Sequence, residues 1–263
     1  MFGRFELACF ALTFLASSRE AGARDHSLFR PTPQAELREL DPDRPDMTES
    51  AHTVDAGHLQ IEMEGLLYRA ERSEDVITEE WEAATAVVKV GVTDSIDVQV
   101  VTESFVVETE SHRTKPGAGR IGLRVKANLY DDDDAALAVV PFGEWDGQRA
   151  DGGLAVPFSI ELPAEFKLGL QAEVDLGGTR NPNAIVPELI ESATLNRTLV
   201  GPLGAFIEVA TVEELVHTSA SVFTNGGLNW MLSRDVRLDA GGRFEVVGEH
   251  HLREFFLGVA ARR

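Results

Sequence analysis

Charged side chains at alternate positions of one stretch are the clearest chemical signal in this sequence. Residues 120–130 read R-I-G-L-R-V-K-A-N-L-Y, so Arg124, Lys126 and Asn128 recur at every second position with apolar residues between them. In a β-strand these polar side chains share one face, whereas a helix would spread charged and apolar groups around the whole cylinder. Cations on one strand face can set the electric field of a water-filled passage. We expect Arg124 and Lys126 to pair with carboxylates of neighbouring strands, because unpaired like charges repel each other.

A cluster of carboxylates near the N-terminus is the second candidate site. Asp41, Asp43, Asp46 and Glu49 offer the oxygen ligands that Ca²⁺ prefers. Their spacing does not match a calcium-binding loop, so the pattern favours a solvated acidic segment over a metal site. Four prolines fall between residues 31 and 45, and proline disfavours helix interiors and central strands. Residues 24–56 are therefore predicted to be an irregular segment that is either exposed or inside a barrel lumen, which it could plug.

The motifs of common enzyme and cofactor sites are missing from the sequence. There is no Gly-x-Ser-x-Gly elbow, His-Glu-x-x-His pair, P-loop or dinucleotide fingerprint. His250 and His251 fall in a predicted turn, and His58 shares the polar face of a predicted strand with Glu62 and Glu64. A hydrated histidine explains His58 better than a metal ligand does. The sequence therefore predicts a protein without enzymatic activity, metal or cofactor.

Composition and charge exclude several classes of protein. The chain has 263 residues, of which 43% are hydrophobic, and this excludes a disordered chain. Its net charge of −20 argues against a nucleic-acid partner, because phosphates would be repelled and not neutralised. The acidity fits a surface or lumen that attracts cations.

The first 23 residues have the layout of a secretory signal peptide. Arg4 precedes the apolar run Leu7–Ala16, and small residues follow at positions 21–23. The run is shorter than the roughly 20 residues of a spanning helix. Cys9 is the only cysteine, so cleavage would leave no disulfide or thiolate chemistry. We predict a signal peptide at 1–23, the irregular segment at 24–56 and a β-barrel at 57–263.

Alternation of apolar and polar residues predicts about twelve β-strands after Gly57. Short turns such as 93–95 alternate with longer polar loops such as 108–117 and 177–187. Pro141 and Pro157 weaken two of the strands, because proline cannot donate to a ladder. The predicted strands are 58–68, 81–92, 96–101, 120–130, 135–142, 154–162, 164–176, 189–199, 205–215, 219–232, 236–246 and 251–261.

Strand length and polarity favour a transmembrane barrel over a soluble sandwich. Sandwich strands usually run about 5–6 residues with the charged face outside. Outer-membrane barrels need about 9–11 residues per strand, an apolar outer band and a polar interior, and closure leaves no edge in lipid. Sparse aromatic residues, which would give only a thin interfacial girdle, are the main argument against the membrane. The residues predicted to line the lumen are Glu62, Glu64, Asp97, Gln99, Arg124, Lys126, Asn128, Lys167, Glu173, Arg237 and Asp239.

Several motifs resemble a known family. The stretches P-D-R-P-D-M-T-E-S at 42–50, Thr53-Val54 and G-H-L-Q at 57–60 are similar to the start of a bacterial family of outer-membrane transporters, which is named for the meta-pathway of phenol degradation. L-R-V-K-A-N-L at 123–129 and Pro141-Phe142 resemble its central strand pair, and N-G-G at 225–227 its late strands. The N-terminal motif contains Asp43, Arg44, Asp46 and Glu49. The resemblance implies a β-barrel that takes up small, often hydrophobic compounds.

Three features depart from the family pattern. Gly119-Arg120 stands where the family has Gly-Asp, and 143–146 read G-E-W-D where it tends to carry Lys-Leu-Pro. The C-terminus reads A-A-R-R and lacks the terminal aromatic residue of typical outer-membrane barrels.

The sequence as a whole predicts an all-β protein, exported to the bacterial outer membrane, that forms a passive channel for small hydrophobic or aromatic solutes. Its expected partners are outer-membrane lipid, the solute and the outer-membrane assembly machinery. One alternative is a non-conducting barrel that serves structure or lipid contact. Another is a soluble periplasmic β-protein that binds a ligand.

Overall fold

A computed structural model describes residues 26–73, 76–83, 85–102, 105–110, 113–117, 119–132, 134–145, 150–177, 186–216, 219–249 and 251–263. The predicted signal peptide at 1–23 lies outside these ranges. Within them, no helix is long and apolar enough to cross a membrane.

The regular structure is entirely β. The strands are β1 (Leu59–Ser73), β2 (Val76–Ala83), β3 (Thr85–Thr93), β4 (Ile96–Thr102), β5 (Phe105–Glu110), β6 (Arg113–Gly117), β7 (Ile121–Asp131), β8 (Ala135–Trp145), β9 (Ala150–Leu162), β10 (Phe166–Gly177), β11 (Val186–Val200), β12 (Leu203–Glu214), β13 (Ala220–Ser233), β14 (Val236–Val247) and β15 (Arg253–Arg262).

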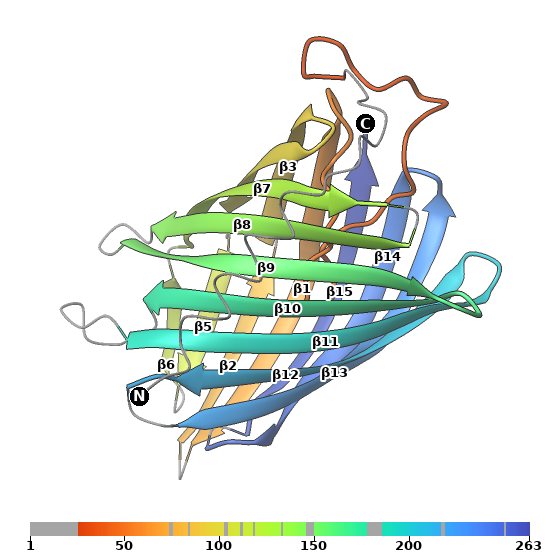
Figure 1. The fold of residues 1–263 in the computed structure, drawn as a ribbon. Helices are drawn as coiled ribbons and strands as arrows, with labels where there is room; N and C mark the ends of the chain where they lie inside the picture. The colour runs from red at the N-terminus through yellow and green to blue at the C-terminus, as the bar shows by residue number, and fades with distance from the viewer. Residues whose placement is uncertain are drawn as a thin grey trace, which may run out of the picture.

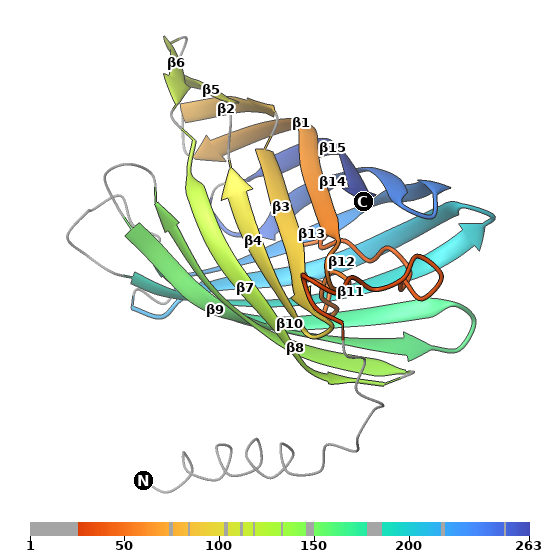
Figure 2. The ribbon, with the colours of Figure 1, turned by 90° about the horizontal axis from the view of Figure 1, so that it is seen from above.

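These strands form one antiparallel sheet that closes on itself (Figure 1, Figure 2). The first strand, β1, pairs with the last, β15, from Gln60↔Arg262 to Ala70↔Arg253. Strands β2 and β3 pair with successive parts of β1 and together count as one strand of the wall. In the same way β4 and β5 pair with β3 and β2 and count as the next strand. Strands β7 and β6 pair with β4 and β5 and count as the one after it. The wall is therefore a closed antiparallel barrel of twelve strands, which confirms the predicted fold class.

Short turns and longer connections lie at opposite ends of the barrel. The turns at 93–96, 131–135, 162–166, 200–203 and 233–236 share one end, which we name the turn end, and β1 begins there and β15 ends there. The other end, the loop end, holds the connections from β8 to β9 and from β10 to β11. Ala164 and Glu165 have φ of 64° and 60°, so they belong to a turn. Strand β10 consequently starts at Phe166, later than predicted.

The polarity of the wall is the reverse of that of a soluble protein. Leu123 is 56% exposed, whereas Lys126 on the opposite face is 1% exposed. Glu62, Asp97 and Glu254 are also among the largest fully buried side chains. Charged side chains are almost never fully buried unless they are paired. The apolar strand faces thus point out of the barrel and the charged faces point in.

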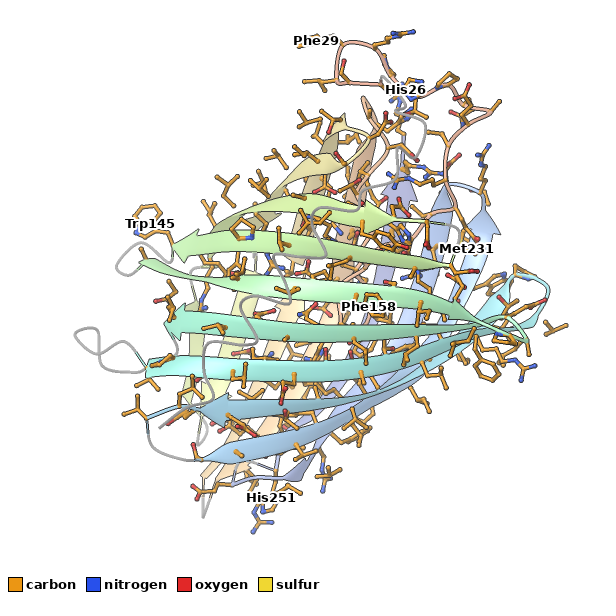
Figure 3. All side chains as sticks on the ribbon, in the orientation of Figure 1. His26, Phe29, Trp145, Phe158, Met231 and His251 are labelled. Atoms are coloured by element: carbon orange, nitrogen blue, oxygen red, sulfur yellow. The ribbon has the colours of Figure 1, made fainter. Side chains whose placement is uncertain are left out.

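The tryptophans lie on the outer surface. Trp145 ends β8 at the loop end (Figure 3), and Trp230 pairs with Leu203 at the turn end. Trp81 contacts Tyr68, with 4.6 Å between the ring centroids. Aromatic rings favour the boundary between hydrocarbon and water. Although they are few, these residues lie at the rims where an interfacial girdle belongs.

Two details of the wall differ from the sequence-based expectation. Residues 108–117, predicted as a loop, fall largely in β5 and β6, whose ladder continues those of β4 and β7. A backbone ladder does not require apolar side chains, so a polar stretch can extend a strand. Both proline-bearing strands persist, but the β8–β9 pairing is interrupted between Leu137↔Phe158 and Val140↔Ala155, where Pro157 lacks an N–H.

Candidate functional site in the barrel lumen

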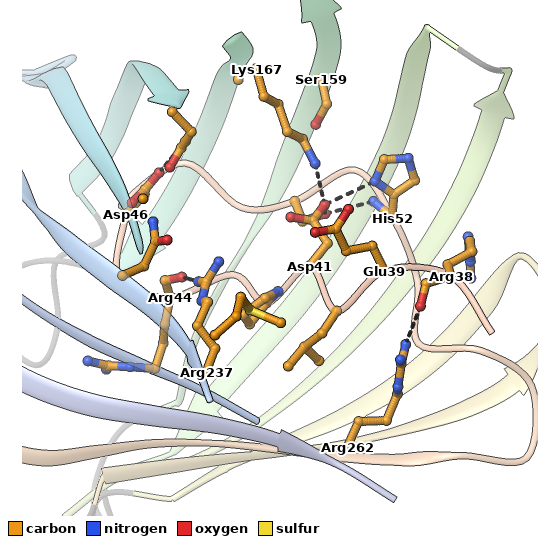
Figure 4. Close-up of a pocket in the computed structure, with 18 of the residues that line it drawn as sticks. Arg38, Glu39, Asp41, Arg44, Asp46, His52, Ser159, Lys167, Arg237 and Arg262 are labelled. Atoms are coloured by element: carbon orange, nitrogen blue, oxygen red, sulfur yellow. Dashed lines mark hydrogen bonds and ion pairs between the residues drawn. The ribbon is translucent and has the colours of Figure 1, made fainter. Parts of the chain in front are cut away.

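Residues 38–55 of the N-terminal segment lie inside the barrel near its turn end (Figure 4). We name them the inserted segment. They bond to inner-face residues of β1, β3, β4, β7, β9, β10, β11, β12, β14 and β15. The segment is therefore attached around the circumference of the lumen and not to one side of it.

Two lysines of the wall converge on one carboxylate of the inserted segment. Nζ of Lys126 lies 2.6 Å from Oδ1 of Asp43 and donates to the carbonyl of Ser50 at 2.7 Å. Nζ of Lys89 contacts Oδ2 of Asp43. Burial alone would raise the pKa of Asp43, but Lys126 and Lys89 lower it well below its usual value. Asp43 is thus an ionised anchor between β3 and β7.

Arg124 of β7 holds the next carboxylate of the segment. Its Nη1 lies 2.6 Å from Oε1 of Glu49, and its Nη2 lies 3.4 Å from Oε1 of Glu144 on β8. The expectation that Arg124 and Lys126 pair with neighbouring strands is therefore only half right. Arg124 has one such partner, whereas the recorded pairs of Lys126 are Asp43 and Glu49 of the inserted segment.

Strands β1 and β14 bind a cation and the backbone of the segment. Arg44 pairs with Asp239 of β14 at 2.9 Å and with Glu64 of β1 at 3.2 Å. Glu62 accepts the backbone N–H groups of Asp43 and Arg44 at 3.3 and 3.2 Å. Burial lowers the pKa of Arg44, but Asp239 and Glu64 raise it above its usual value. Arg44 therefore stays charged between two acidic strands.

The deepest turn of the segment is held by Glu208 of β12. Its carboxylate accepts the N–H of Met47 at 2.9 Å and the N–H and hydroxyl of Thr48 at 2.8 and 2.7 Å. Asn225 of β13 donates to the same carboxylate at 2.9 Å, and the hydroxyl of Ser192 lies 2.7 Å from that of Thr48. Hydrogen bonds to charged groups are the stronger kind, so Glu208 fixes this turn.

Asp46 lies beside this turn, and among the described residues it forms no ion pair. Its Oδ2 accepts the hydroxyl of Thr194 at 2.6 Å and the amide of Asn196 at 3.2 Å, while Oδ1 is buried without a bond. Burial and the neighbouring Glu208 raise the pKa of Asp46 to about 7. This carboxylate of the inserted segment therefore titrates near neutral pH.

A third carboxylate of the inserted segment pairs with β10 near the turn end. Asp41 lies 2.5 Å from Nζ of Lys167 and 3.0 Å from Nδ1 of His52. Burial would raise the pKa of Asp41, but Lys167 and His52 lower it well below its usual value. The pKa of His52 is lowered by burial but raised overall by Asp131 and Asp41.

The two ends of the inserted segment meet at a neck on the turn end. Thr32 N–H donates to the carbonyl of Ala56 at 2.9 Å, and Ala56 bridges to Gly91 of β3. A side chain at position 91 would lie 2.1 Å from the carbonyl oxygen of Asp55, so only glycine fits there. The carboxylate of Asp55 also pairs with Arg262 of β15 at 3.1 Å. Residues 33–55 thus form a loop that is closed at its base.

A cavity of about 1000 Å³ lies between the inserted segment and strands β9 to β14 (Figure 4). Its lining includes Asp46, Lys167, Asn196, Asn229 and Arg237. The volume is in the range of small-molecule sites, and the lining combines both signs of charge with amides.

The loop-end half of the lumen is organised differently. Glu254 of β15, 1% exposed, pairs with Arg69 of β1 at 2.6 Å and with Arg243 of β14 at 2.9 Å. Arg69 also pairs with Glu80 of β2 at 3.0 Å. These residues are direct register partners, so the ion pairs run around the wall from strand to strand.

An apolar cluster lies on the inner wall near this ladder. Leu67, Phe206 and Phe256 pack together although they come from β1, β12 and β15. The strands between them carry Gly227 and Gly241, and a methyl group there would meet the rings of Phe206 and Phe256 at 2.8 and 2.7 Å. Glycine on β13 and β14 therefore leaves room for the two rings against the wall.

The structure brings together most of the residues that the sequence placed in the lumen. Of the eleven, nine bond directly to the N-terminal segment. Gln99 bonds instead to Asp97, and Glu173 to Gln171. The nine are Glu62, Glu64, Asp97, Arg124, Lys126, Asn128, Lys167, Arg237 and Asp239.

The carboxylates at 41–49 were expected to form a solvated segment, and this is wrong. Glu49 is 8% exposed, and Asp41, Asp43 and Glu49 are all bonded to cations of the wall. Their partners are remote in sequence, so no local pattern could reveal the burial. Among the described residues, no group of three or more His, Cys, Asp and Glu side chains is arranged to hold a metal ion.

Five further residues line the lumen although they were not predicted to do so: Glu208, Ser192, Thr194, Asn196 and Arg262. The first four alternate in phase with the polar face of their strands, so the same period that identified Lys126 could have found them. Arg262 lies at the end of the chain, where the alternation was not applied.

Closed antiparallel walls with an apolar outside and a charged inside define an outer-membrane-type β-barrel. Solved barrels share this fold. The NanC porin superposes with a TM-score of 0.54 at 10% identity, covering 77% of this chain and 98% of that one. The KdgM porin gives 0.50 at 8% identity, with 74% and 97% covered. The translocator domain of the autotransporter NalP from Neisseria meningitidis gives 0.50 at 9%, with 78% and 87% covered.

Neither a protein-family model nor a curated protein matches the chain. Identities of this size show a shared fold and leave the activity to be argued from the lumen.

Proposed function

We propose that this protein is an outer-membrane channel for small solutes, with a passage restricted by its own inserted segment. The observation that carries the proposal is the inverted polarity of the wall, which has Leu123 outside and Lys126, Glu62 and Asp97 inside. A charged face directed into a closed cylinder needs water or an ionic partner, whereas the apolar face needs lipid. Export through the signal peptide at 1–23 and insertion by the outer-membrane assembly machinery belong to the same proposal.

The solute class rests on the lumen and on the family resemblance. The resemblance implies small hydrophobic or aromatic compounds. The apolar cluster of Leu67, Phe206 and Phe256 makes part of the inner wall apolar, although its side chains are only 2–5% exposed. The polar cavity beside the inserted segment would hold the hydrated part of a solute.

The inserted segment supports a second candidate function, a barrel that conducts nothing. Its bonds reach ten of the strands described above, and buried pairs such as Lys126–Asp43 hold it across the lumen. The barrel would then serve as a membrane anchor or lipid contact.

Swelling of proteoliposomes separates the two functions. We expect purified protein to let small sugars enter faster than in empty vesicles, and more so after residues 39–50 are replaced by a glycine–serine linker of equal length. If neither protein swells the vesicles, the barrel does not conduct and the channel proposal fails.

A further inference from the structure

The wall cations that hold the inserted segment each have a second carboxylate on the wall itself. Lys89 contacts Glu62 of β1 as well as Asp43. Arg124 lies 3.4 Å from Glu144 of β8, and Lys167 lies 4.0 Å from Glu161 of β9. These wall carboxylates stay in place whether or not the segment is present.

The fourth cation, Lys126, also has a second carboxylate on the wall. Its register partner on β4 is Asp97, whose carboxylate accepts Gln99 at 2.9 Å and the N–H of Val54 at 2.9 Å. Withdrawal of the segment would remove the bond from Val54 and leave Asp97 beside Lys126. All four cations would therefore keep a carboxylate within one strand.

Asp239 of β14, which pairs with Arg44 of the segment, has a second cation nearby on the wall, Arg237. Within the described residues its only recorded bond is to the carbonyl of Arg44, and its Nε is buried without a partner. Arg237 and Asp239 are two residues apart on β14 and share its inner face. If Arg44 left, the guanidinium of Arg237 would be released from its carbonyl and could take over Asp239.

Removing one partner of a buried ion pair is costly because the other charge stays buried and unpaired. Duplicate partners on the wall remove that obstacle here. The neck also keeps the segment attached: Leu28 N–H donates to Val92 at 2.8 Å, Thr32 to Ala56 at 2.9 Å and Gly57 to Gly91 at 2.8 Å. Both ends of the loop are thus fixed at the end of β3.

We propose that the inserted segment is a retractable gate that swings out of the lumen at the turn end about this neck. The gate rests on the proposed channel function, since it controls the same passage. In the closed state Asp41, Asp43, Arg44 and Glu49 bind the wall. In the open state the wall charges pair with one another and the cavity joins the rest of the lumen.

A disulfide between Thr48 and Ser192 tests the gate. Their hydroxyl oxygens are 2.7 Å apart, and both residues are buried. In a Cys9→Ser background, which has no other cysteine, the Thr48→Cys/Ser192→Cys protein would be locked by oxidation and freed by reduction. The single variants Thr48→Cys and Ser192→Cys, given the same oxidant and reductant, are the matched controls.

In planar bilayers we expect the oxidised double variant to stay closed and reduction to raise its open fraction at least tenfold, reversibly, with no change in either single variant. Equal conductance before and after reduction overturns the gate, because the segment then either never moves or never blocks. A protein with residues 39–50 replaced by a glycine–serine linker shows which proposal has failed. If that protein conducts, the channel proposal stands. If it does not conduct, both the channel proposal and the gate proposal are overturned.

Chemical labelling tests the movement of the inserted segment independently of any measurement of conduction. A membrane-impermeant maleimide should label reduced Thr48→Cys in folded barrels slowly but completely, at a rate set by gate opening. Thr194→Cys, buried in the same wall, gives the accessibility of the site once the segment has left. Protection of both cysteines over the lifetime of the folded barrel overturns the gate.

Discussion

The two halves of the lumen satisfy their charges by different means. At the loop end Glu254 pairs with Arg69 and Arg243, which lie on adjacent strands and in register with it. At the turn end Lys126 pairs with Asp43, which belongs to a segment folded in from outside the wall. The loop-end pairs follow from the ladder alone, whereas the turn-end pairs with Asp43 exist only while the segment is docked.

This difference shows that a charged residue on the inner face can pair either with another residue of the wall or with the inserted segment. Strand alternation identifies both kinds in the same way. Only the partner separates them, so substitutions in the two halves should have separable effects on the barrel and on the segment.

The largest expected effect is on the loop-end ladder. Glu254→Ala removes the carboxylate that Arg243 and Arg69 share. Breaking a buried pair from one side costs about 3–5 kcal/mol. We expect the barrel to lose its compact band on detergent gels at a lower temperature. Glu161→Ala, whose side chain is 53% exposed, is the control and should cost about 0–1 kcal/mol; equal losses would contradict the comparison.

A substitution in the other half should free the segment and spare the wall. Glu208→Ala removes the acceptor of the Met47 and Thr48 N–H groups, and each buried donor left without a partner costs about 1–3 kcal/mol. Hydrogen exchange at these two amides should accelerate, while that of the β15 amides stays unchanged. Glu208→Gln keeps an acceptor oxygen, so its exchange rates at these amides should fall between those of the unaltered protein and of Glu208→Ala. Faster exchange throughout the barrel would show that the segment and wall form one unit.

The packing of the apolar cluster should respond to glycine substitution. Gly241→Ala would bring a methyl group within 2.7 Å of the Phe256 ring and 2.6 Å of the Gly226 carbonyl oxygen. Overpacking of this kind costs about 1–3 kcal/mol. Gly143→Ala meets only an oxygen at 3.7 Å and serves as the control. Thermal unfolding of the two variants should differ, and similar unfolding temperatures would remove the steric argument.

The last prediction concerns the pH dependence of docking. With its pKa raised to about 7, Asp46 is protonated in the docked segment at a pH where a free carboxyl is already ionised. Through Asp46, docking is therefore strongest near the ordinary carboxyl pKa of about 4 and weakens about tenfold per pH unit as pH rises toward 7, whereas below about pH 4 the lowered pKa values of Asp41 and Asp43 weaken it again. Exchange of the Thr48 amide, corrected for its intrinsic pH dependence, should follow this course. Asp46→Asn should remove this decline between about pH 4 and about pH 6, below the range in which His52 titrates, and its persistence would assign it to another group.

The wall could be predicted from the sequence because its signal is local. The period of two in residues 120–130 identifies both faces of β7, and repetition of that pattern gives the strand number. The polar stretch at 108–117 was misread because it carries no apolar face, although the backbone ladder continues through it.

The interior of the turn end could not be predicted in the same way. Asp43 meets Lys126 and Lys89 only because the barrel brings β3 and β7 around the segment. Nothing within a few residues of Asp43 distinguishes it from a solvated aspartate. Arg237 was placed in the lumen by its phase, but its single bond to a backbone carbonyl depends on where Arg44 lies.

The sequence separations of these contacts carry a consequence for biogenesis. Arg44 and Asp239 are 195 positions apart, and Arg38 and Arg262 are 224 apart. The segment is synthesised before every strand that receives it, yet some of its partners belong to the last two strands. Contacts of such long range form late. Its carboxylates must therefore remain hydrated through export and strand assembly, and the seam between β1 and β15 is sealed at about the moment when the lumen first has a place for them.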